Sequence, residues 1–195
     1  MESGPDTYLR CFIALAISDH IRRECGDIIE RLKKHDADVK WVRVDNMHLT
    51  LKFLGKTPQK VLPEIQEYLF NVVLSYNPFY IRIYTTGVFP NRKYPRVIWI
   101  GVEDSDMLKR LHEDIENTMV SLGFKKEQRP FKPHLTLGRV RSREGIVHLV
   151  HDLDMLKDKD FGNIHVKKIK LMKSDLKPQG AIYSCLYDIP LGKEA

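Results

Sequence analysis

The apolar positions of this chain follow two spacings, one typical of strands and one typical of helices. Residues 8–17 (YLRCFIALAI) are almost continuously apolar and partly β-branched, which predicts a buried strand. In residues 19–35 the apolar side chains recur at helical spacing, and Ser18 stands where a helix N-cap is expected. The chain is therefore expected to begin with a strand followed by an amphipathic helix.

The rest of the chain is expected to continue this mixture of short strands and helices. Further helices are predicted over residues 63–76, where Pro63 suits the first turn, and over 106–123 and 145–156. Strands are predicted over residues 38–44, 48–55, 79–90, 95–102, 133–140, 165–176 and 181–191. This order of elements predicts an α+β fold with largely antiparallel sheets.

The composition indicates an ordinary globular protein and argues against a membrane protein, a disulfide framework and a zinc cluster. Hydrophobic residues make up 43% of the chain and charged residues 30%, as in ordinary globular proteins. No apolar run approaches the roughly 18 residues that span a bilayer, so no membrane segment is expected. The scattered cysteines (Cys11, Cys25 and Cys185) argue against a disulfide framework or a zinc cluster. The segment MESGPDTYLR lacks the features of a secretory signal, so the reducing cytoplasm is the expected compartment.

The chain carries a formal net charge of +6 and has a pI of about 9.1. A positive field raises the rate of encounter with phosphates and RNA, so an anionic partner is one interpretation of this charge. A basic but otherwise ordinary surface is the other interpretation. The charge alone does not decide between them, so a function has to be argued from a motif.

The tetrapeptide His-Leu-Thr-Leu occurs twice, at residues 48–51 and at residues 134–137, each time in a predicted strand. Side chains alternate along a strand, so the leucines share one face while the histidine and the threonine share the other. In the first copy His48 and Thr50 therefore project together, and Lys52 is expected next on the same face. The two copies are so far apart in sequence that two lobes are needed to bring them together.

Two such strands facing each other would supply two imidazoles and two hydroxyls, because His134 and Thr136 project from the second copy in the same way. Imidazole titrates near pH 6.5, so at neutral pH one ring can be protonated while the other is neutral. In-line displacement at phosphorus needs this combination of a base for the nucleophile and an acid for the leaving oxygen. The threonine hydroxyls can donate hydrogen bonds to non-bridging oxygens, and the scheme requires no metal or cofactor.

Two other interpretations of the repeat are weaker. A single HxT on a strand is more often structural than functional, but two copies with the same leucine phase are hard to explain in that way. Two histidines could also bind a metal ion, which would need a third ligand. Asp45 is close to the first copy, but nothing comparable precedes His134, so a metal site is not expected.

The segments around both copies resemble the 2H phosphoesterases, a family named for two HxT or HxS motifs, and most closely its RNA 2′,3′-cyclic phosphodiesterase (2′-5′ RNA ligase) branch. The resemblance extends along nearly the whole chain and is carried by LRCFIAL, KWVRVDNMHLTLKFLG, GVFPNRKYPRVIWIGV, FKPHLTLGRVR and SDLKPQGAIYSCLYDIPL. It implies one bilobal domain over residues 1–195. In this domain two pseudo-symmetric lobes would place antiparallel sheets along a central cleft and helices on the outside.

The resemblance also implies an activity. Members hydrolyse a terminal 2′,3′-cyclic phosphate of RNA to a 2′-phosphomonoester, and some join such an end to a 5′-hydroxyl without ATP. By the family pattern His48 is the proton donor to the departing O3′, and His134 is the proton acceptor that activates water. Thr50 and Thr136 would bind the phosphate. The implied partners are RNA ends that carry a cyclic phosphate, such as those of tRNA fragments. The protein is expected to be a monomer and to need no cofactor.

Two cations close to the motifs are further candidates for phosphate binding. Strict alternation puts Arg139 on the leucine face, so it can reach the phosphate only if the strand bends at Gly138. Lys52 lies on the required face, although a solvated charge at the rim is the alternative. Arg141 and Arg143 could contact an RNA backbone or belong to a solvated loop.

Aromatic residues supply candidates for base stacking, which contributes about 1–3 kcal/mol per base. The candidates are Trp41, Phe12 and Tyr94. Core packing is the expected role of Trp41 and Phe12.

Two alternatives to an RNA 2′,3′-cyclic phosphodiesterase stay open at this point. The first is a phosphodiesterase of the same chemistry that acts on a small cyclic phosphate or on a 2′-5′ oligonucleotide, and kcat/KM values would separate these substrates. The second is a non-catalytic RNA- or nucleotide-binding module, which would bind RNA in a salt-dependent way without forming product. The presence of both histidines and both threonines argues against the second alternative.

Overall fold

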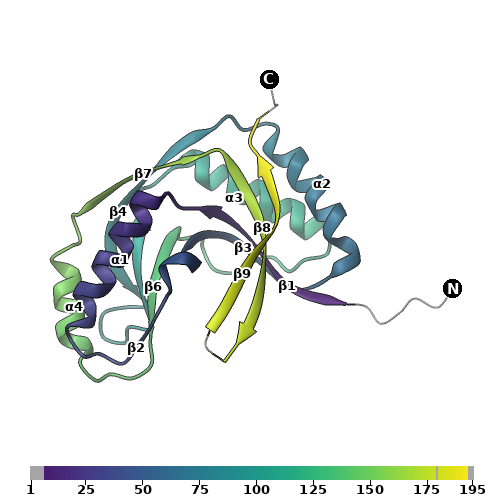
Figure 1. The fold of residues 1–195 in the computed structure, drawn as a ribbon. Coiled ribbons are helices and arrows are strands. Elements are labelled where there is room, and N and C mark those ends of the chain that lie inside the picture. Colours follow the sequence, from purple (N-terminus) through teal and green to yellow (C-terminus); the bar gives the residue numbers. More distant parts are fainter. Residues whose placement is uncertain (1–6, 179, 193–195) are drawn as a thin grey trace.

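The computed structural model describes residues 7–178 and 180–192, and within them the strands form two antiparallel sheets. Residues 1–6, which belong to the segment considered for a secretory signal, lie outside the described part. The strands are β1 (Tyr8–Ala16), β2 (Val39–Trp41), β3 (His48–Pro58), β4 (Phe79–Phe89), β5 (Val97–Val102), β6 (His134–Val140), β7 (Asp160–Val166), β8 (Lys168–Lys177) and β9 (Gly180–Pro190). The first sheet has the order β3-β1-β8-β9, and the second has the order β2-β6-β5-β4-β7. Figure 1 shows the two sheets as the halves of an arch.

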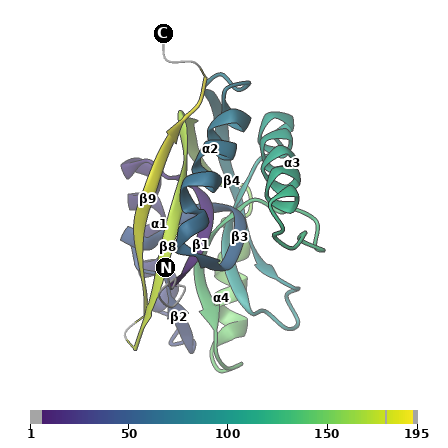
Figure 2. The same cartoon turned by 90° about the vertical axis from the view of Figure 1, so that its right-hand side faces the viewer.

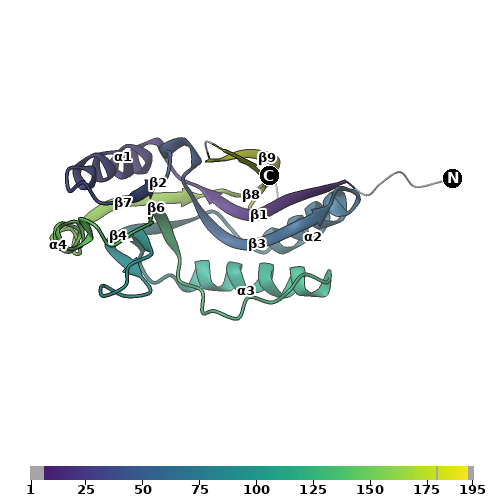
Figure 3. The ribbon, with the colours of Figure 1, turned by 90° about the horizontal axis from the view of Figure 1, so that it is seen from below.

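Helices pack against both sheets in the described part of the chain. They are α1 (Asp19–Lys33), α2 (Leu62–Val73), α3 (Asp106–Ser121) and α4 (Ile146–Asp154), with short 3₁₀ turns η1 (Val44–Asn46) and η2 (Gln59–Val61). Helices α2 and α3 contact β9 and β3, and we call the first sheet with these helices lobe A. Helices α1 and α4 contact β7 and β4, and we call the second sheet with these helices lobe B. In Figure 3 the helices of lobe B lie at one end of the molecule and those of lobe A towards the other.

The local sequence explains where α1 and α3 begin. Ser18 Oγ accepts a hydrogen bond from the backbone N–H of Ile21 at 3.3 Å, and Ser105 Oγ accepts one from the N–H of Leu108 at 3.2 Å. Both serines are therefore N-caps, as their positions in the sequence predict. Helix α3 is followed by Gly123, whose φ of +86° suits a residue without a Cβ. None of the helices in residues 7–178 and 180–192 is long and apolar enough to cross a membrane.

The two lobes exchange strands. Strand β4 comes from the first half of the chain but lies in lobe B between β5 and β7, whereas β8 comes from the second half and lies in lobe A between β1 and β9. The helices cross in the same way, because α1 follows β1 of lobe A yet packs on lobe B, and α3 follows β5 of lobe B yet packs on lobe A. The trio β3-β1-β8 thus corresponds to the trio β6-β5-β4, and each lobe contains segments from both halves of the chain.

The motif leucines lie on the buried side of the sheets, as alternation predicts. Leu49 and Leu135 are both fully buried, and so is Leu137, while Leu51 is 3% exposed. They belong to one apolar core that includes the inner faces of the helices. Figure 2 shows the strands of lobe A in the order β9, β8, β1 and β3.

Two predicted strands differ from the observed ones. The segment predicted as one strand over residues 165–176 is divided, because β7 ends at Val166 in lobe B and β8 begins at Lys168 in lobe A. The segment 38–44 contains only the short strand β2, after which the chain turns into η1. In both cases the apolar pattern continues across a point where the chain changes partners.

Candidate active site

The two motif strands lie next to each other at the junction of the lobes. Strand β3, which begins with His48, contacts strand β6, which begins with His134. Figures 1 and 3 show both strands near the middle of the molecule, between the two pairs of helices. The structure therefore brings together two segments that are distant in sequence, as the repeat requires.

Each motif histidine is held by the same backbone interaction. The Nδ1 atom of His48 lies 2.8 Å from the carbonyl oxygen of Asn46, and the Nδ1 atom of His134 lies 2.7 Å from the carbonyl oxygen of Lys132. A carbonyl oxygen only accepts hydrogen bonds, so Nδ1 carries the proton in both rings. The nitrogen that can gain or lose a proton in both rings is therefore Nε2.

The turn before the first motif is tied to the far end of the chain. Asn46 donates a hydrogen bond from Nδ2 to the carbonyl oxygen of Ala181 in β9 at 2.8 Å. Because the carbonyl of Asn46 also accepts from His48, this contact links β9 to the orientation of the first imidazole. The sequence contains no signal for this link, since it joins residues more than a hundred positions apart.

Both imidazoles have a pKa below the ordinary value, and burial is the main cause. Burial lowers the pKa of His48, and the hydrogen bond to the Asn46 carbonyl opposes this effect. Burial also lowers the pKa of His134 against the effect of the Lys132 carbonyl, and the positive charge of Arg139 lowers it further. The two rings thus share a desolvated environment, but the pKa of His134 is lowered by a cation as well.

A β-bulge follows the threonine in the first motif. Thr50 and Lys52 face consecutive positions of β1, so the intervening Leu51 has no partner in the ladder. The bulge turns Lys52 to the helix side, where it is only 4% exposed. Its Nζ lies 2.6 Å from Oε1 of Glu116 in α3. The prediction that Lys52 lies on the histidine face and binds phosphate is therefore wrong, because the extra residue reverses the alternation.

The second motif has the same bulge at the corresponding residue. Thr136 and Gly138 face consecutive positions of β5, which leaves Leu137 without a partner. After the bulge Arg139 returns to the face that carries Thr136, where it is exposed and its charge acts on His134. The bend that Arg139 needs is therefore present, one residue earlier than the sequence suggested.

The structure adds Phe53 to the candidate site, a residue that sequence reasoning missed. Phe53 stands at the position of lobe A that corresponds to Arg139 in lobe B, and its side chain is 66% exposed. Its ring lies 6.2 Å from that of Phe12, which in turn lies 4.7 Å from the ring of His48. An alignment of HLTLKF with HLTLGR places Phe53 opposite Arg139. It would have pointed to Phe53 only if the bulge in each strand had been known.

Aromatic rings from distant strands also surround the two histidines. In lobe A, Tyr183 of β9 meets His48 edge-on at 5.1 Å. In lobe B, Phe89 of β4 meets His134 edge-on at 5.0 Å and stacks on Trp99 of β5. These contacts were not foreseen from the sequence, because no local pattern connects β9, β4 and β5 to the motifs.

The aromatic candidates named from the sequence have different positions. Phe12 is 3% exposed and packs on His48, so it is both a core residue and a wall of the site. Trp41 packs against the core, as expected. Tyr94 is 51% exposed in the loop between β4 and β5. Among residues 7–178 and 180–192 no cluster of three or more His, Cys, Asp or Glu side chains is arranged to hold a metal ion.

Comparison with known proteins assigns the chain to a family. Residues 17–178 match the model of the 2′-5′ RNA ligase superfamily, and the chain belongs to this family. The chain is 36% identical over 179 residues to an RNA 2′,3′-cyclic phosphodiesterase of Methanothermobacter thermautotrophicus, covering 90% of this chain and 95% of that protein. It is 38% identical over 178 residues to an RNA 2′,3′-cyclic phosphodiesterase of Methanocaldococcus jannaschii, covering 91% and 98%. The resemblance inferred from the doubled motif is confirmed.

Solved structures agree with this assignment at the level of the fold. A protein of Thermus thermophilus superposes with a TM-score of 0.80 at 27% identity, covering 95% of this chain and all of that chain (100%). Escherichia coli LigT complexed with 3′-AMP superposes with a TM-score of 0.76 at 22% identity, covering 96% and 100%. The predicted α+β fold with two lobes is therefore confirmed.

Proposed function

We propose that this protein is an RNA 2′,3′-cyclic phosphodiesterase that produces a 2′-phosphomonoester by proton transfer through His48 and His134. The observation that carries the proposal is the equivalent attachment of the two histidines to the backbone. Each histidine is the first residue of one of two strands that contact each other, and in each ring Nδ1 is bound to a backbone carbonyl, which leaves Nε2 to gain or lose a proton. The names of the curated relatives support this activity.

The proposed reaction is a single displacement at phosphorus. His134 Nε2 accepts a proton from water, whose oxygen attacks the phosphorus atom. The bond between phosphorus and O3′ breaks, and His48 Nε2 gives its proton to O3′, which leaves the phosphate on O2′. Thr50 and Thr136 donate hydrogen bonds to the non-bridging oxygens, and Arg139 balances their negative charge.

The two rings differ in one electrostatic respect. Burial is the main cause that lowers the pKa of both His48 and His134, and the positive charge of Arg139 lowers the pKa of His134 further. A neighbouring cation favours the neutral form of an imidazole, and a neutral ring is required of the base. The charge of Arg139 therefore favours the role of base for His134, as the family pattern implies.

The proposal extends to ligation and to the cellular context. If the 5′-hydroxyl of a second RNA replaces water, His134 accepts its proton and His48 again gives a proton to O3′, so that a 2′-5′ bond forms without ATP. We include RNA ends such as those of tRNA fragments among the substrates. The protein is proposed to act in the cytoplasm as a monomer, with residues 1–195 forming one bilobal domain around a central cleft.

A hydrolysis assay tests the proposed function. An oligoribonucleotide ending in a 2′,3′-cyclic phosphate is incubated with the wild type, His48→Ala and His134→Ala in the presence of EDTA. Each variant is expected to lose about 10²–10⁴-fold in kcat, and the wild-type product is expected to be the 2′-phosphate rather than the 3′-phosphate. His165→Ala is the control, because this ring stacks on Tyr80 in lobe B, away from both motifs. Unaltered turnover in either motif variant would overturn the proposal.

A further inference from the structure

A cavity of about 630 Å³ lies in lobe B between helix α4 and the loop that joins β4 to β5. Its walls include residues 91–94 of the loop, Trp99 of β5 and Leu153 of α4. This volume lies within the range of about 300–1,000 Å³ that is usual for small-molecule sites, so it can hold a nucleotide. The loop contributes two cations, Arg92 and Lys93, of which Arg92 pairs with Asp154 at 2.6 Å.

Trp99 joins this cavity to the candidate active site. It lies opposite Thr136 in the neighbouring strand, and its ring stacks at 5.0 Å on Phe89, which contacts His134. Its Nε1–H is buried without a hydrogen-bond partner, which is uncommon for a buried donor. A ligand that extends from Thr136 over Trp99 would therefore enter the cavity directly.

Tyr94 forms an exposed platform at the mouth of the cavity. Its side chain is 51% exposed, and Lys93 Nζ lies 5.5 Å from the centre of the ring. Arg143, which comes from the segment between β6 and α4, places its guanidinium carbon 5.3 Å from the same ring. An exposed aromatic ring with flanking cations suits a nucleobase that stacks while its phosphates meet positive charge.

A row of exposed cations continues from the candidate site towards this platform. Arg139 and Lys40 are opposite each other in adjacent strands, and Arg141 follows Arg139 by two positions, which puts it on the same side. Within the described part of the chain, these three cations and Arg143 form no ion pair with an acidic side chain. Their charges are therefore available to a polyanion.

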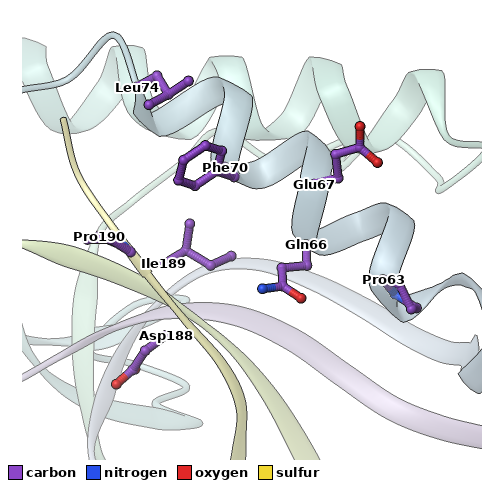
Figure 4. Close-up of a pocket in the computed structure, with 8 residues that line it drawn as sticks. All are labelled: Pro63, Gln66, Glu67, Phe70, Leu74, Asp188, Ile189 and Pro190. Atoms are coloured by element: carbon purple, nitrogen blue, oxygen red, sulfur yellow. The ribbon is translucent and has the colours of Figure 1, made fainter. Parts of the chain in front are cut away.

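Lobe A offers a different surface. Two lysines of β8 are paired, since Lys168 and Lys170 both lie 2.6 Å from Asp188. A cavity of about 590 Å³ in lobe A lies between α2 and β9, and its charged residues Glu67 and Asp188 are acidic (Figure 4). Lobe A also has an exposed ring beside a cation, Tyr8 with Lys56, but neither residue lines the lobe A cavity. In lobe B the exposed ring, Tyr94, lines the cavity itself.

From these contacts we infer that lobe B binds the nucleotides that precede the terminal cyclic phosphate. One of their bases stacks against Tyr94, and the adjoining nucleotides occupy the cavity. The inference rests on the proposed function and deepens it. The preferred substrate is an oligoribonucleotide, and a nucleoside 2′,3′-cyclic phosphate is a poorer one. The alternative of a small cyclic phosphate as the main substrate is disfavoured by the same surface.

Steady-state kinetics on two substrates test the inference. The ratio of kcat/KM for a tetraribonucleotide ending in a 2′,3′-cyclic phosphate to kcat/KM for a nucleoside 2′,3′-cyclic phosphate is measured for the wild type and for Tyr94→Ala/Arg143→Ala. The ratio is expected to exceed 1 in the wild type and to fall about 5- to 150-fold in the variant, as for the loss of one stacked base. The matched control is Tyr8→Ala/Lys56→Ala, which removes an exposed tyrosine and the lysine 4.2 Å above its ring from lobe A. This control is expected to leave the ratio unchanged.

Binding of the same tetraribonucleotide, measured by fluorescence anisotropy at several salt concentrations, separates the two proposals. The Tyr94→Ala/Arg143→Ala variant is expected to bind more weakly and with a smaller salt dependence than the wild type and the lobe A control. If the wild type hydrolyses neither substrate, the proposed function fails. If the ratio and the binding are the same in the two double variants, the inference about lobe B fails while the proposed function stands.

Discussion

Lobes A and B present the same strand, the same bulge and the same histidine, but the neighbours of the two histidines differ. In lobe A the rings of Phe12 and Tyr183 lie 4.7 Å and 5.1 Å from that of His48. In lobe B, Phe89 lies 5.0 Å from His134, and a cation, Arg139, adds its charge. A repeated backbone can thus hold two imidazoles alike while the side chains around them give each ring a different electrostatic environment.

The bulge produces a second contrast between the lobes. The residue that it turns towards the helices is Lys52 in lobe A and Gly138 in lobe B. Lys52 reaches Glu116 in α3, whereas a Cβ on Gly138 would come within 2.6 Å of Val39 in β2. Lobe B therefore accommodates an additional strand, β2, beside its motif strand, where lobe A ends with β3.

The largest change is expected from breaking the buried ion pair between Lys52 and Glu116, which has no counterpart at Gly138 of lobe B. Lys52→Met removes the cation that pairs with the buried carboxylate of Glu116 and leaves it the backbone N–H of Glu127 as a donor, which should cost about 3–5 kcal/mol of the free energy of unfolding. Urea unfolding at pH 7 measures this loss. The double variant Lys52→Met/Glu116→Gln removes the uncompensated charge and is expected to recover most of the stability. A loss below about 1 kcal/mol in the single variant would show that the pair contributes little.

The next largest effect is expected at Arg139, the cation of lobe B whose counterpart in lobe A is Phe53. Arg139→Gln is expected to lower kcat/KM for a cyclic phosphate about 10- to 150-fold, as for the loss of one charged hydrogen bond. It should also raise the pKa of His134, and since the base must be neutral, the acidic limb of the pH–rate profile should move to higher pH. Arg139→Lys, which keeps the charge, is expected to leave that limb in place. An unmoved limb in Arg139→Gln would contradict the role of this charge.

A smaller effect is expected at the position where lobe B has glycine. Gly138→Ala introduces a methyl group that would lie 2.6 Å from Val39 Cγ1 and 3.0 Å from Trp41 Cε3. Overpacking of this kind costs about 1–3 kcal/mol, which thermal unfolding would detect. Gly55→Ala is not a suitable control, because φ at Gly55 is +71°. An alanine there would strain the backbone instead of overpacking the core. A variant that also shortens Val39 to alanine should regain stability, and no regain would contradict the contact.

The smallest effect is expected from giving lobe A the charge of lobe B. Phe53→Arg places a cation at the position that corresponds to Arg139, which should lower the pKa of His48. Because the proposed acid must be protonated, activity is lost as pH rises through this pKa, so the basic limb should move to lower pH by up to about one unit. Phe53→Gln removes the same ring without adding charge and is the control. If the two variants have the same pH–rate profile, position 53 in lobe A is not equivalent to position 139 in lobe B.

Sequence reasoning succeeded where the signal is local. The N-caps Ser18 and Ser105, the buried motif leucines and the projecting histidines follow from the spacing of polar and apolar residues. The doubled motif also indicated the family, which the match over residues 17–178 confirms. Such features depend on contacts within one helix or on the alternation of one strand, so they need no knowledge of the partner segments.

The failures have a common physical cause. Alternation predicted that Lys52 would accompany Thr50, but the bulge at Leu51 depends on how β3 pairs with β1. The apolar run of residues 165–176 gave no indication that its two parts belong to different sheets. Pairing register is a property of two strands at once, and it is not visible in either strand alone.

The sequence by itself determined that this protein would alternate strands and helices, bury its motif leucines and carry the two histidines of a recognisable family on the opposite face, because these are properties of short segments. Only the tertiary structure decided which side Lys52 and Arg139 face, which aromatic rings surround His48 and His134, and where unpaired cations gather. These features depend on strand exchange, on two bulges and on contacts between residues that the chain brings together from opposite ends.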